Sequence, residues 1–402
     1  MLIDIILNNA RMKAIKFMNT NQIFDDLFVL ELANNHWGNL ERGLKIINDY
    51  GKIVRFNNIR AAIKLQFRDV DNFIHKDFRD RTDVRYIKKT LATKMSQENY
   101  AAMVEAIRKN SCIPMASTFD EASVDLCVKL DLPIIKIASA DLNDWILIEK
   151  IASTRKPVIA STGGSSLKDM DDLVHFFEKR NIPFAINHCV SLYPSEDNEL
   201  ELNQIDFLKD RYPGHTIGFS THEYHNWEYS VMIAYAKGAR TFERHIDIDQ
   251  GGIPVSQYCS LPHQIDTWFK AYYKAKEMSG APGTAKRNPP LREIEYLDGT
   301  IRGVYAKYDL PKGHRIKDTD LYLAIPLLKG QLSCRELMAG EVLLKEIKKD
   351  KPIFIEEIDS PYAYNETLRS YVYERGINPT PPQNDEENSK KRLKRRKKHS
   401  KY

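Results

Sequence analysis

Two histidines each end a short apolar segment of this sequence. His222 lies two residues after the segment Thr216–Ser220, and His245 is the last residue of the segment Thr241–His245. Both segments are rich in β-branched and aromatic residues, which predicts buried strands that present an imidazole at their C-terminal ends. Two neutral imidazoles held side by side suit a divalent ion such as Mn²⁺, Fe²⁺ or Zn²⁺. The alternative is that one or both are hydrogen-bonded histidines of the fold.

Two lysines interrupt other apolar segments. Lys64 lies within Ala61–Gln66, and Lys136 lies within Ile134–Ala138. A lysine inside a strand of this kind is costly unless its ammonium meets an anion or a carboxylate. With the Ser and Thr hydroxyls and the Gly-Gly turn that follow neighbouring segments, the two lysines predict a pocket for a compact anion such as a phosphate ester. The alternative is that each lysine pairs with an acid of the protein or extends to solvent.

The elements that would position these groups are eight apolar segments separated by helical stretches. They are Leu27–Leu32, Ala61–Gln66, Ile113–Ser117, Ile134–Ala138, Pro157–Ser161, Phe184–His188, Thr216–Ser220 and Thr241–His245. Continuous apolar strands that alternate with helices are typical of parallel strands covered on both faces. Eight such units predict an α/β fold, a (β/α)₈ TIM barrel. An open doubly wound sheet is the competing architecture, and the lack of GxGxxG after the first strand argues against it.

Barrel enzymes carry their active sites at the C-terminal ends of the strands, and polar residues gather there in this sequence. The candidate site residues are Glu31, Lys64, Gln66, Thr118, Lys136, Ser139, Asp141, Ser161, Ser191, Tyr193, Ser220, His222 and His245.

The domain organisation follows from changes in composition along the chain. We expect the barrel over residues 1–285 and a linker over 286–300, after the Gly/Pro-rich stretch Ser279–Pro290. Short β-like pieces and turns predict a small β-rich domain over 301–358. Residues 359–402 are rich in Tyr, Asn, Pro and charge, and we expect them to be largely disordered.

The overall charge is concentrated in the last residues. The chain of 402 residues has a formal net charge of +5, and Lys390–Tyr402 contains nine Lys and Arg, so the other 389 residues sum to −4. This mildly acidic body argues against nucleic-acid binding by the folded part. The basic run is consistent with a solvated tail, nuclear import or contact with an acidic partner. Five scattered cysteines without a CxxC, and no apolar run long enough to cross a membrane, predict a cytoplasmic protein.

Eight short motifs occur in order and at barrel spacing: ELANNHWGN, AIKLQ, STFDE, IKIASAD, ASTGG, INHCVSLYPSE, IGFSTHE and ERHID. Together they resemble the N-acetylneuraminate (sialic acid) synthase family. The later stretch RGVYAKYDLPKGHRIKDTDLYLAIP resembles the antifreeze-like, or SAF, domain that follows the barrel in that family. The resemblance covers roughly residues 27–358.

The resemblance implies condensation of phosphoenolpyruvate with an open-chain N-acylmannosamine-type aldose, giving a nine-carbon 2-keto acid and phosphate. It implies that a divalent metal, Mn²⁺ with Mg²⁺, Co²⁺ or Fe²⁺ as alternatives, binds His222 and His245. Glu31, Gln66 and Asp141 would orient water and the reacting groups, and Tyr193 would face the sugar. The residues implied to hold phosphoenolpyruvate are Lys64, Thr118, Lys136, Ser139, Ser161, Ser191 and Ser220. The family also implies a homodimer in which the SAF domain covers the partner's barrel.

Four positions depart from the family pattern. Asp141 stands where the family has Glu, and Thr221 replaces the Asp of an SDH motif. Ser256 aligns with an Asp, and Ile325 with an Arg that reaches the sugar's acyl group. The acceptor half of the site is therefore altered. Two alternatives follow: the same chemistry on a 6-phosphorylated, diacylated or non-amino aldose, or a binding protein that keeps the fold without turnover.

Overall fold

A closed barrel of eight parallel strands forms the larger part of the protein, in a computed structural model that describes residues 22–336 and 340–379. The strands follow one another around the barrel in sequence order, with β1 hydrogen-bonded to β8. Their bounds are β1 (Leu27–Ala33), β2 (Ala61–Phe67), β3 (Ile113–Thr118), β4 (Ile134–Ile137), β5 (Val158–Ser161), β6 (Phe184–Cys189), β7 (Thr216–Thr221) and β8 (Thr241–His245). The predicted (β/α)₈ barrel is confirmed, and each strand end lies within one residue of its expected position.

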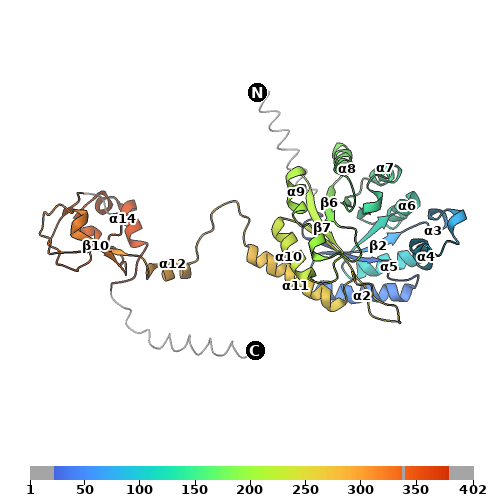
Figure 1. Ribbon diagram of the computed structural model, residues 1–402, viewed down its shortest axis with the longest axis horizontal. Helices are drawn as coiled ribbons and strands as arrows, with labels where there is room; N and C mark the ends of the chain where they lie inside the picture. The colour runs from blue at the N-terminus through green and yellow to red at the C-terminus, as the bar shows by residue number, and fades with distance from the viewer. Residues whose placement is uncertain (1–21, 337–339, 380–402) are drawn as a thin grey trace, which may run out of the picture. The chain divides into compact units, whose positions relative to one another are not determined.

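Helices surround the strands on the outside (Figure 1). They are α2 (Leu40–Phe56), α3 (Val70–Phe73), α4 (Arg85–Ala92), α5 (Gln97–Lys109), α6 (Glu121–Lys129), α7 (Trp145–Ser153), α8 (Leu167–Lys179), α9 (Gln204–Arg211), α10 (Trp227–Lys237) and α11 (Pro262–Ser279), with short 3₁₀ turns η1 (Lys76–Phe78), η2 (Ser139–Asp141) and η3 (Asp197–Glu199).

Local sequence sets where several of these helices begin and end. Asn39, Ser96 and Asp120 each accept a hydrogen bond from a backbone N–H in the first turn of α2, α5 and α6. Such caps satisfy donors that have no partner within the helix. Gly238 ends α10 with φ of 103°, a backbone conformation that glycine adopts readily.

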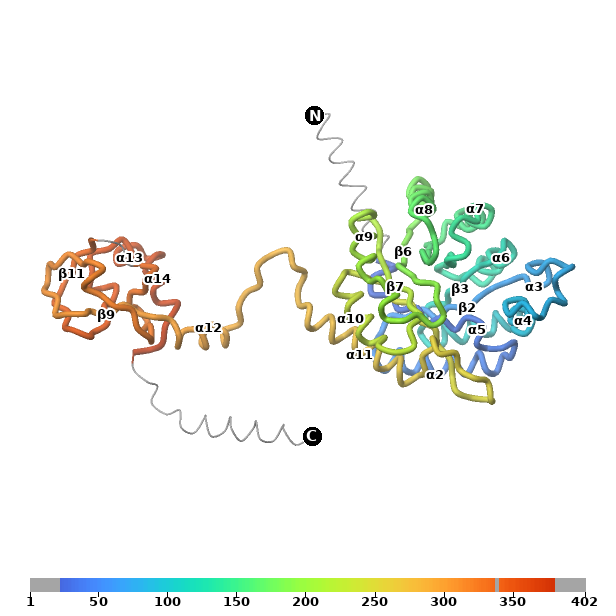
Figure 2. Tube along the Cα trace, in the orientation of Figure 1, coloured from blue at the N-terminus to red at the C-terminus, as the bar shows by residue number. Residues whose placement is uncertain are grey.

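Alternate residues of each strand face opposite sides of the barrel wall. Phe28, on β1, faces outward and packs against Phe242, Trp268 and Tyr272, with ring centroids about 5 Å apart (5.0, 4.9 and 4.9 Å). Trp268 and Tyr272 belong to α11, the last helix of the barrel. α11 lies beside α2, the first of these helices (Figure 2).

The other face of each strand lines the interior. Near the N-terminal ends of the strands, an apolar cluster of Phe24, Leu27, Val29, Met115 and Ile159 is fully buried. This cluster fills the barrel interior at the N-terminal ends of the strands. On β1, β3 and β5 the next residue of the same interior face is polar: Glu31, Ser117 and Ser161, each two positions after a residue of the apolar cluster.

A second compact unit begins at Gly283 and has its own apolar core, after a first unit that ends at Pro282. Its elements are α12 (Leu291–Asp298), β9 (Gly303–Ala306), η4 (Asp318–Asp320), β10 (Leu321–Ala324), β11 (Val342–Leu343), η5 (Ile355–Glu357), β12 (Ile358–Asp359), α13 (Pro361–Tyr364) and α14 (Glu366–Tyr373). β9 pairs with β10 and β11 with β12, both antiparallel.

This unit extends beyond its expected limits on both sides. α12 lies within the expected linker, and α13 and α14 lie within the segment expected to be largely disordered. The physical reason is tertiary: Val372 is buried in the core of this unit, and Arg375 forms a 2.6 Å ion pair with Asp298 at the end of α12. The basic run Lys390–Tyr402 lies outside the described residues. In the part of the chain that is described, no helix has the length and apolarity needed to span a membrane.

Gly218, in the middle of β7, provides a test of the interior packing. A Cβ at this position would overlap the side-chain oxygens of Thr241 and Asn187 and lie 2.7 Å from the Thr241 carbonyl oxygen. We expect Gly218→Ala to lower the free energy of unfolding by about 1–3 kcal/mol, because a packed interior tolerates added volume poorly. Chemical denaturation measures this change. Gly214→Ala is the matched control, since a Cβ there meets no atom within 4 Å; an equal loss in both variants would contradict the packing argument.

Candidate active site

A cluster of buried charges occupies the barrel interior near the C-terminal ends of β1, β2, β4 and β8. Glu243 on β8 contacts both lysines: its carboxylate lies 2.7 Å from Lys136 Nζ and 3.4 Å from Lys64 Nζ. Lys64 also forms a short ion pair with Glu31, and Ser220 donates a 3.1 Å hydrogen bond to Glu243. Both lysines thus meet acids of the barrel, which is the alternative that the sequence left open.

The register of the strands explains why these groups meet. Glu31 lies opposite Lys64 on β2 and opposite His245 on β8. Closure of the barrel therefore places one carboxylate between a lysine and a histidine that are 181 positions apart in the sequence. Glu243 precedes His245 by two residues and so faces the same side of β8.

The electrostatics of the cluster are dominated by burial and by opposite charges. Burial alone would raise the pKa of Glu243, but the positive charges of Lys136 and Lys64 outweigh it and hold that pKa well below its usual range. Burial lowers the pKa of Lys64 to about 7, although the charge of Glu243 partly offsets this effect. The protonation of Lys64 therefore depends on its neighbours, because a nearby anion favours the positively charged form.

The two strand-end histidines lie next to this cluster. The ring centroids of His222 and His245 are 5.3 Å apart. His222 Nδ1 lies 2.8 Å from the carbonyl oxygen of Val190, which can only accept, so Nδ1 carries the proton and Nε2 keeps its lone pair. Burial lowers the pKa of His222 to about 4 and that of His245 well below its usual value, so both imidazoles are neutral at pH 7.

These features fit a divalent metal held by two imidazoles. Neutral rings are the form that binds metal, and a hydrogen bond from the other ring nitrogen to a carbonyl fixes the orientation of a ligand histidine. His245 Nδ1 is buried and has no hydrogen-bond partner among the described residues. Over residues 22–336 and 340–379, no three or more His, Cys, Asp or Glu side chains are placed so that together they could hold a metal ion.

A buried ion pair joins two residues that adjoin the histidines in the sequence. Arg244, which precedes His245, lies 3.3 Å from the carboxylate of Glu223, which follows His222. Arg244 also donates to the Glu223 carbonyl oxygen (2.7 Å), and Thr221 donates to the Glu223 carboxylate. The acid that the family pattern has at position 221 is therefore present two residues later, joined to the neighbouring strand.

Hydroxyl groups line the opposite side, at the ends of β3 to β6. Ser139 Oγ accepts a 3.1 Å hydrogen bond from the backbone N–H of Gly163. A Cβ at Gly163 would overlap Ser191 Oγ and lie 2.9 Å from Ser139 Oγ, so these two hydroxyls adjoin the Gly-Gly turn. The hydroxyls of Thr118 and Ser161 are buried and have no hydrogen-bond partner among the described residues. This side of the barrel therefore has donors ready for an anion.

Gln66 and Asp141 complete the set of predicted polar residues. Gln66 Nε2 donates to Glu31 (3.2 Å), which links it to the charge cluster. Asp141 Oδ2 is buried without a hydrogen-bond partner in the described part of the chain, and burial, aided by Asp144, raises the pKa of Asp141 to about 6. The pKa of Asp141 is thus close to neutral pH, as a group that gives and takes a proton near neutral pH requires.

Aromatic rings cover the histidines. Tyr193 lies with its ring centroid 4.0 Å from that of His222, and Tyr258 lies 5.1 Å from His245. Ser256, one of the positions that departs from the family, hydrogen-bonds to Tyr258. Tyr193 is 52% exposed, so it forms the outer rim of this side.

The structure joins five of the thirteen predicted residues into one network, through a partner that sequence reasoning missed. Glu31, Gln66, Lys64, Lys136 and Ser220 are joined into one network by Glu243. The signal for Glu243 was present: it shares a strand face with His245, and a buried lysine requires a counter-charge.

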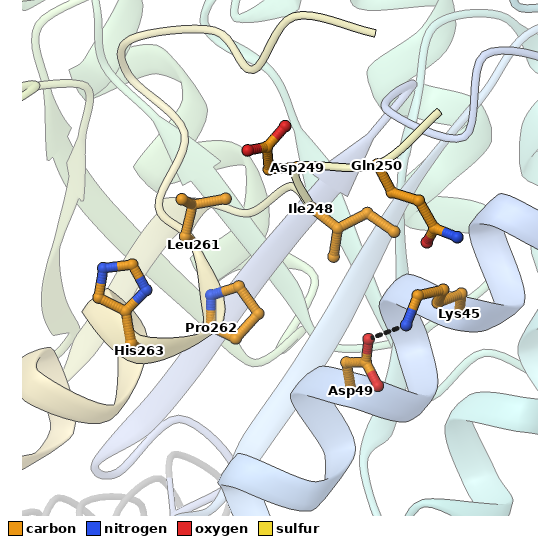
Figure 3. Close-up of a pocket in the computed structure, with 8 residues that line it drawn as sticks. All are labelled: Lys45, Asp49, Ile248, Asp249, Gln250, Leu261, Pro262 and His263. Carbon is orange, nitrogen blue, oxygen red and sulfur yellow. Dashed lines mark hydrogen bonds and ion pairs between the residues drawn. The ribbon is translucent and has the colours of Figure 1, made fainter. Parts of the chain in front are cut away.

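A separate hollow of about 420 Å³ lies on the flank of the barrel (Figure 3). It is lined by Lys45, Asp49, Ile248, Asp249, Gln250, Leu261, Pro262 and His263. Lys45 and Asp49, one turn apart on α2, already form a 2.7 Å ion pair across it. None of the candidate site residues lines this hollow, so we do not assign the chemistry to it.

Comparison with known proteins places this geometry in a family. Residues 58–282, more than half of the chain, match the NeuB family. The N-acetylneuraminate-9-phosphate synthase of Drosophila melanogaster is 25% identical over 366 residues, which cover 83% of this chain and 96% of that protein. The N,N'-diacetyllegionaminic acid synthase of Campylobacter jejuni is 23% identical over 339 residues, covering 81% and 98%.

A solved structure agrees with this result. Spore coat polysaccharide biosynthesis protein E of Chromobacterium violaceum superposes with a TM-score of 0.77 at 33% identity, covering 83% of this chain and 99% of that one. The barrel, the residues at its C-terminal end and these similarities lead to one conclusion: this chain belongs to the NeuB family.

Proposed function

We propose that the protein condenses phosphoenolpyruvate with an open-chain N-acylmannosamine-type aldose to give a sialic-acid-like nonulosonate and phosphate. The observation that carries this proposal is the pair of neutral imidazoles, His222 and His245, beside the buried Lys64–Glu243–Lys136 cluster. An aldehyde activator and an anion site are the two parts that the condensation needs. The names of the relatives, which are synthases of nonulosonates, support the same reaction.

Lys64 and Lys136 are the proposed contacts for the phosphate and carboxylate of phosphoenolpyruvate. Both ammonium groups are buried, and a buried charge acts in a less polar medium than water, where its attraction for an anion is stronger. The hydroxyls of Thr118 and Ser161, which lack partners, support this role, as do those of Ser139, Ser191 and Ser220. These groups would hold the enol in one orientation before the acceptor arrives.

His222 and His245 are the proposed ligands of a divalent ion, with Mn²⁺ as the expected metal. When bound, such an ion supplies Lewis acidity that polarises the aldehyde oxygen of the acceptor. Glu31 and Gln66, hydrogen-bonded to each other, would orient the water that adds to C2 of phosphoenolpyruvate once its C3 has bonded to the aldehyde carbon, after which phosphate leaves from C2. Asp141 would assist with a proton at the reacting oxygens, since its carboxyl is close to half-protonated near pH 6.

Two positions that the resemblance assigns to acceptor binding depart from the family pattern: Ser256 in the barrel unit and Ile325 in the second unit. Tyr193 is the proposed contact for the sugar, because a half-exposed ring beside His222 offers a face for its carbon skeleton. Ile325, which is 60% exposed, presents an apolar group where the family has an arginine. The exact aldose is therefore best identified by assay.

The direct test is turnover with a panel of acceptors. We expect the full-length protein, given phosphoenolpyruvate and Mn²⁺, to release phosphate and form a 2-keto acid with at least one N-acylated aldose. His222→Ala and His245→Ala should each lower turnover by more than about a hundredfold and weaken Mn²⁺ binding, because water does not replace a positioned imidazole. Mn²⁺ affinity is read from the paramagnetic resonance signal of the free ion.

Two controls accompany this test. His75→Ala removes an exposed histidine and should leave both Mn²⁺ affinity and turnover unchanged. A chelator should abolish turnover, and added Mn²⁺ should restore it. Full turnover of either strand-end variant in chelator-treated buffer would show that the histidines belong to the fold alone.

Asp141 gives a pH-dependent prediction. Its pKa is raised from 3.8 to about 6, so the folded chain holds this proton more tightly than the unfolded chain. The carboxylate therefore lowers stability as the pH rises through 4 to 6, and the loss is complete above about pH 6. We expect Asp141→Asn to raise the free energy of unfolding by on the order of 1–2 kcal/mol at pH 7.5, with little effect at pH 4. The same variant should lose turnover. Equal stability of the two proteins at pH 7.5 would contradict the burial of a charged carboxylate.

We also propose that the protein is a homodimer, as the family resemblance implies. An open barrel mouth leaves a reactive enol exposed to water, and a cover from a second copy would exclude it. Sedimentation equilibrium of the full-length protein should give twice the mass of one chain at micromolar concentration. A monomer that turns over substrate at the same rate across a wide concentration range would oppose this assembly.

A further inference from the structure

The Arg244–Glu223 ion pair links the two segments that carry the histidines, and the proposed reaction does not use it. Arg244 directly precedes His245, and Glu223 directly follows His222. The two side chains are 1% and 0% exposed, and the guanidinium and carboxylate lie 3.3 Å apart. Apolar residues of similar volume often stabilise a fold as well as a buried ion pair does. Stability alone is therefore a weak explanation of this pair.

The pair lies between β8 and α10, outside the barrel interior. Successive side chains of a strand point to opposite faces, so Arg244 points away from the face that carries His245. Its guanidinium carbon lies 5.6 Å from the ring centroid of Trp227, at the start of α10. Ser230, on the same helix, donates a hydrogen bond to the Glu223 carboxylate. The pair therefore affects a ligand in the barrel interior only through the residues next to it.

The guanidinium of Arg244 is hydrogen-bonded to the backbone of both histidine segments. On one side it donates to the carbonyl oxygen of Glu223 (2.7 Å), the residue directly after His222. On the other side its Nε donates to Ser260 Oγ (2.5 Å), and the backbone N–H of Ser260 donates to the carbonyl oxygen of His245 (2.9 Å). Because the donors of a guanidinium form a rigid planar fork, these contacts limit how far the two segments can move apart.

The pairing of the two strands ends just where the histidines begin. The register of β7 with β8 has Thr221 opposite Arg244 as its last pair, one residue before His222, and His245 pairs with β1 instead. Beyond the end of a ladder, its regular hydrogen bonds no longer fix one strand against the next. The contacts of Arg244 with Glu223 continue the connection past that point.

Glu223 is the principal counter-charge of Arg244. Burial lowers the pKa of Arg244, and the negative charge of Glu223 is the largest influence that opposes this effect, with a smaller contribution from Glu228. The hydroxyls of Thr221 and Ser230 both donate to the Glu223 carboxylate. A carboxylate held by two hydroxyls and a guanidinium is fixed in place, and it fixes the guanidinium in turn.

We propose that Arg244 and Glu223 are positioning residues that set the separation of His222 and His245, and through it the affinity of the site for a divalent ion. This inference rests on the proposed function, because it takes the two histidines as metal ligands. Their ring centroids are 5.3 Å apart. Ligand groups must be held within about 0.5 Å of their productive positions, so a small shift of either segment weakens metal binding.

The test measures Mn²⁺ affinity in the full-length protein, from the paramagnetic resonance signal of the free ion. Arg244→Met combined with Glu223→Gln, the charge-free variant, removes both charges and leaves none unpaired, so we expect its thermal stability to stay close to that of the wild type. It should bind Mn²⁺ roughly ten- to a hundredfold more weakly, the range seen when groups that orient metal ligands are removed. Lys237→Met combined with Asp206→Asn is the matched control: it removes a 2.6 Å ion pair between α10 and α9 and should leave Mn²⁺ affinity unchanged.

A relocated carboxylate gives a second test, which does not require the charge-free variant to fold. Position 221 faces Arg244 in the strand register, so Thr221→Asp combined with Glu223→Thr, the relocated variant, returns an acid to the guanidinium. We expect this variant to recover both stability and Mn²⁺ affinity. Wild-type affinity in the charge-free variant, or weak Mn²⁺ binding by a stable relocated variant, would overturn the proposal.

Phosphoenolpyruvate binding distinguishes positioning from a general loosening of the barrel. Calorimetry at saturating Mn²⁺ should give an affinity of the charge-free variant for phosphoenolpyruvate within about twofold of the wild type, because effects at separate sites are usually independent. A loss of phosphoenolpyruvate affinity as large as the loss of Mn²⁺ affinity would show that the pair supports the fold as a whole, and would overturn the positioning role.

Mn²⁺ binding also separates this inference from the proposed function. If the wild-type protein binds Mn²⁺, the charge-free variant binds it weakly and no acceptor is turned over, the positioning pair is supported and the proposed reaction is overturned. If turnover occurs and the charge-free variant keeps wild-type Mn²⁺ affinity, the reaction stands and the pair is overturned. A wild-type protein that binds no Mn²⁺ would overturn both the pair and the metal site.

Discussion

The interior of the barrel depends on a balance of four buried charges. Glu31 and Glu243 supply two negative charges, and Lys64 and Lys136 supply two positive ones, so the cluster as a whole is neutral. An isolated charge at this depth would destabilise the fold by several kcal/mol, roughly, whereas paired charges satisfy one another. The balance exists only because the barrel is closed: the four residues come from β1, β2, β4 and β8, and β1 must meet β8 for Glu31 to lie beside the others.

The same closure sets the state of the histidines. His245 lies in register with Glu31, and His222 follows the adjacent strand with its ring beside that of His245. Burial and the nearby positive charges keep both rings neutral, as a metal ligand must be. The proposed anion-binding half and the proposed metal-binding half of the site therefore both depend on one arrangement of strands.

Much of this arrangement could be predicted from the sequence, because the strands are continuous apolar runs and parallel strands end at one edge. The positions of His222, His245 and the two lysines followed from that rule alone. The partner of the lysines did not, since the sequence does not say which side chains lie across a barrel interior. α12 and α14 were also missed: each is short, and each is held by a contact distant in sequence, the Arg375–Asp298 pair and the burial of Val372.

The Arg244–Glu223 pair has a consequence for how such proteins diverge. The family pattern has an acid directly before the first histidine, and this chain has threonine there and an acid directly after it. Arg244 is buried in this chain and requires a carboxylate within reach, and that carboxylate can come from any neighbouring position that points towards it. Natural selection then acts on a location in space, and the residue that fills it is free to shift along the chain. A motif written as a string of letters would record only a missing acid at position 221, although a carboxylate two residues later meets a buried cation in the fold.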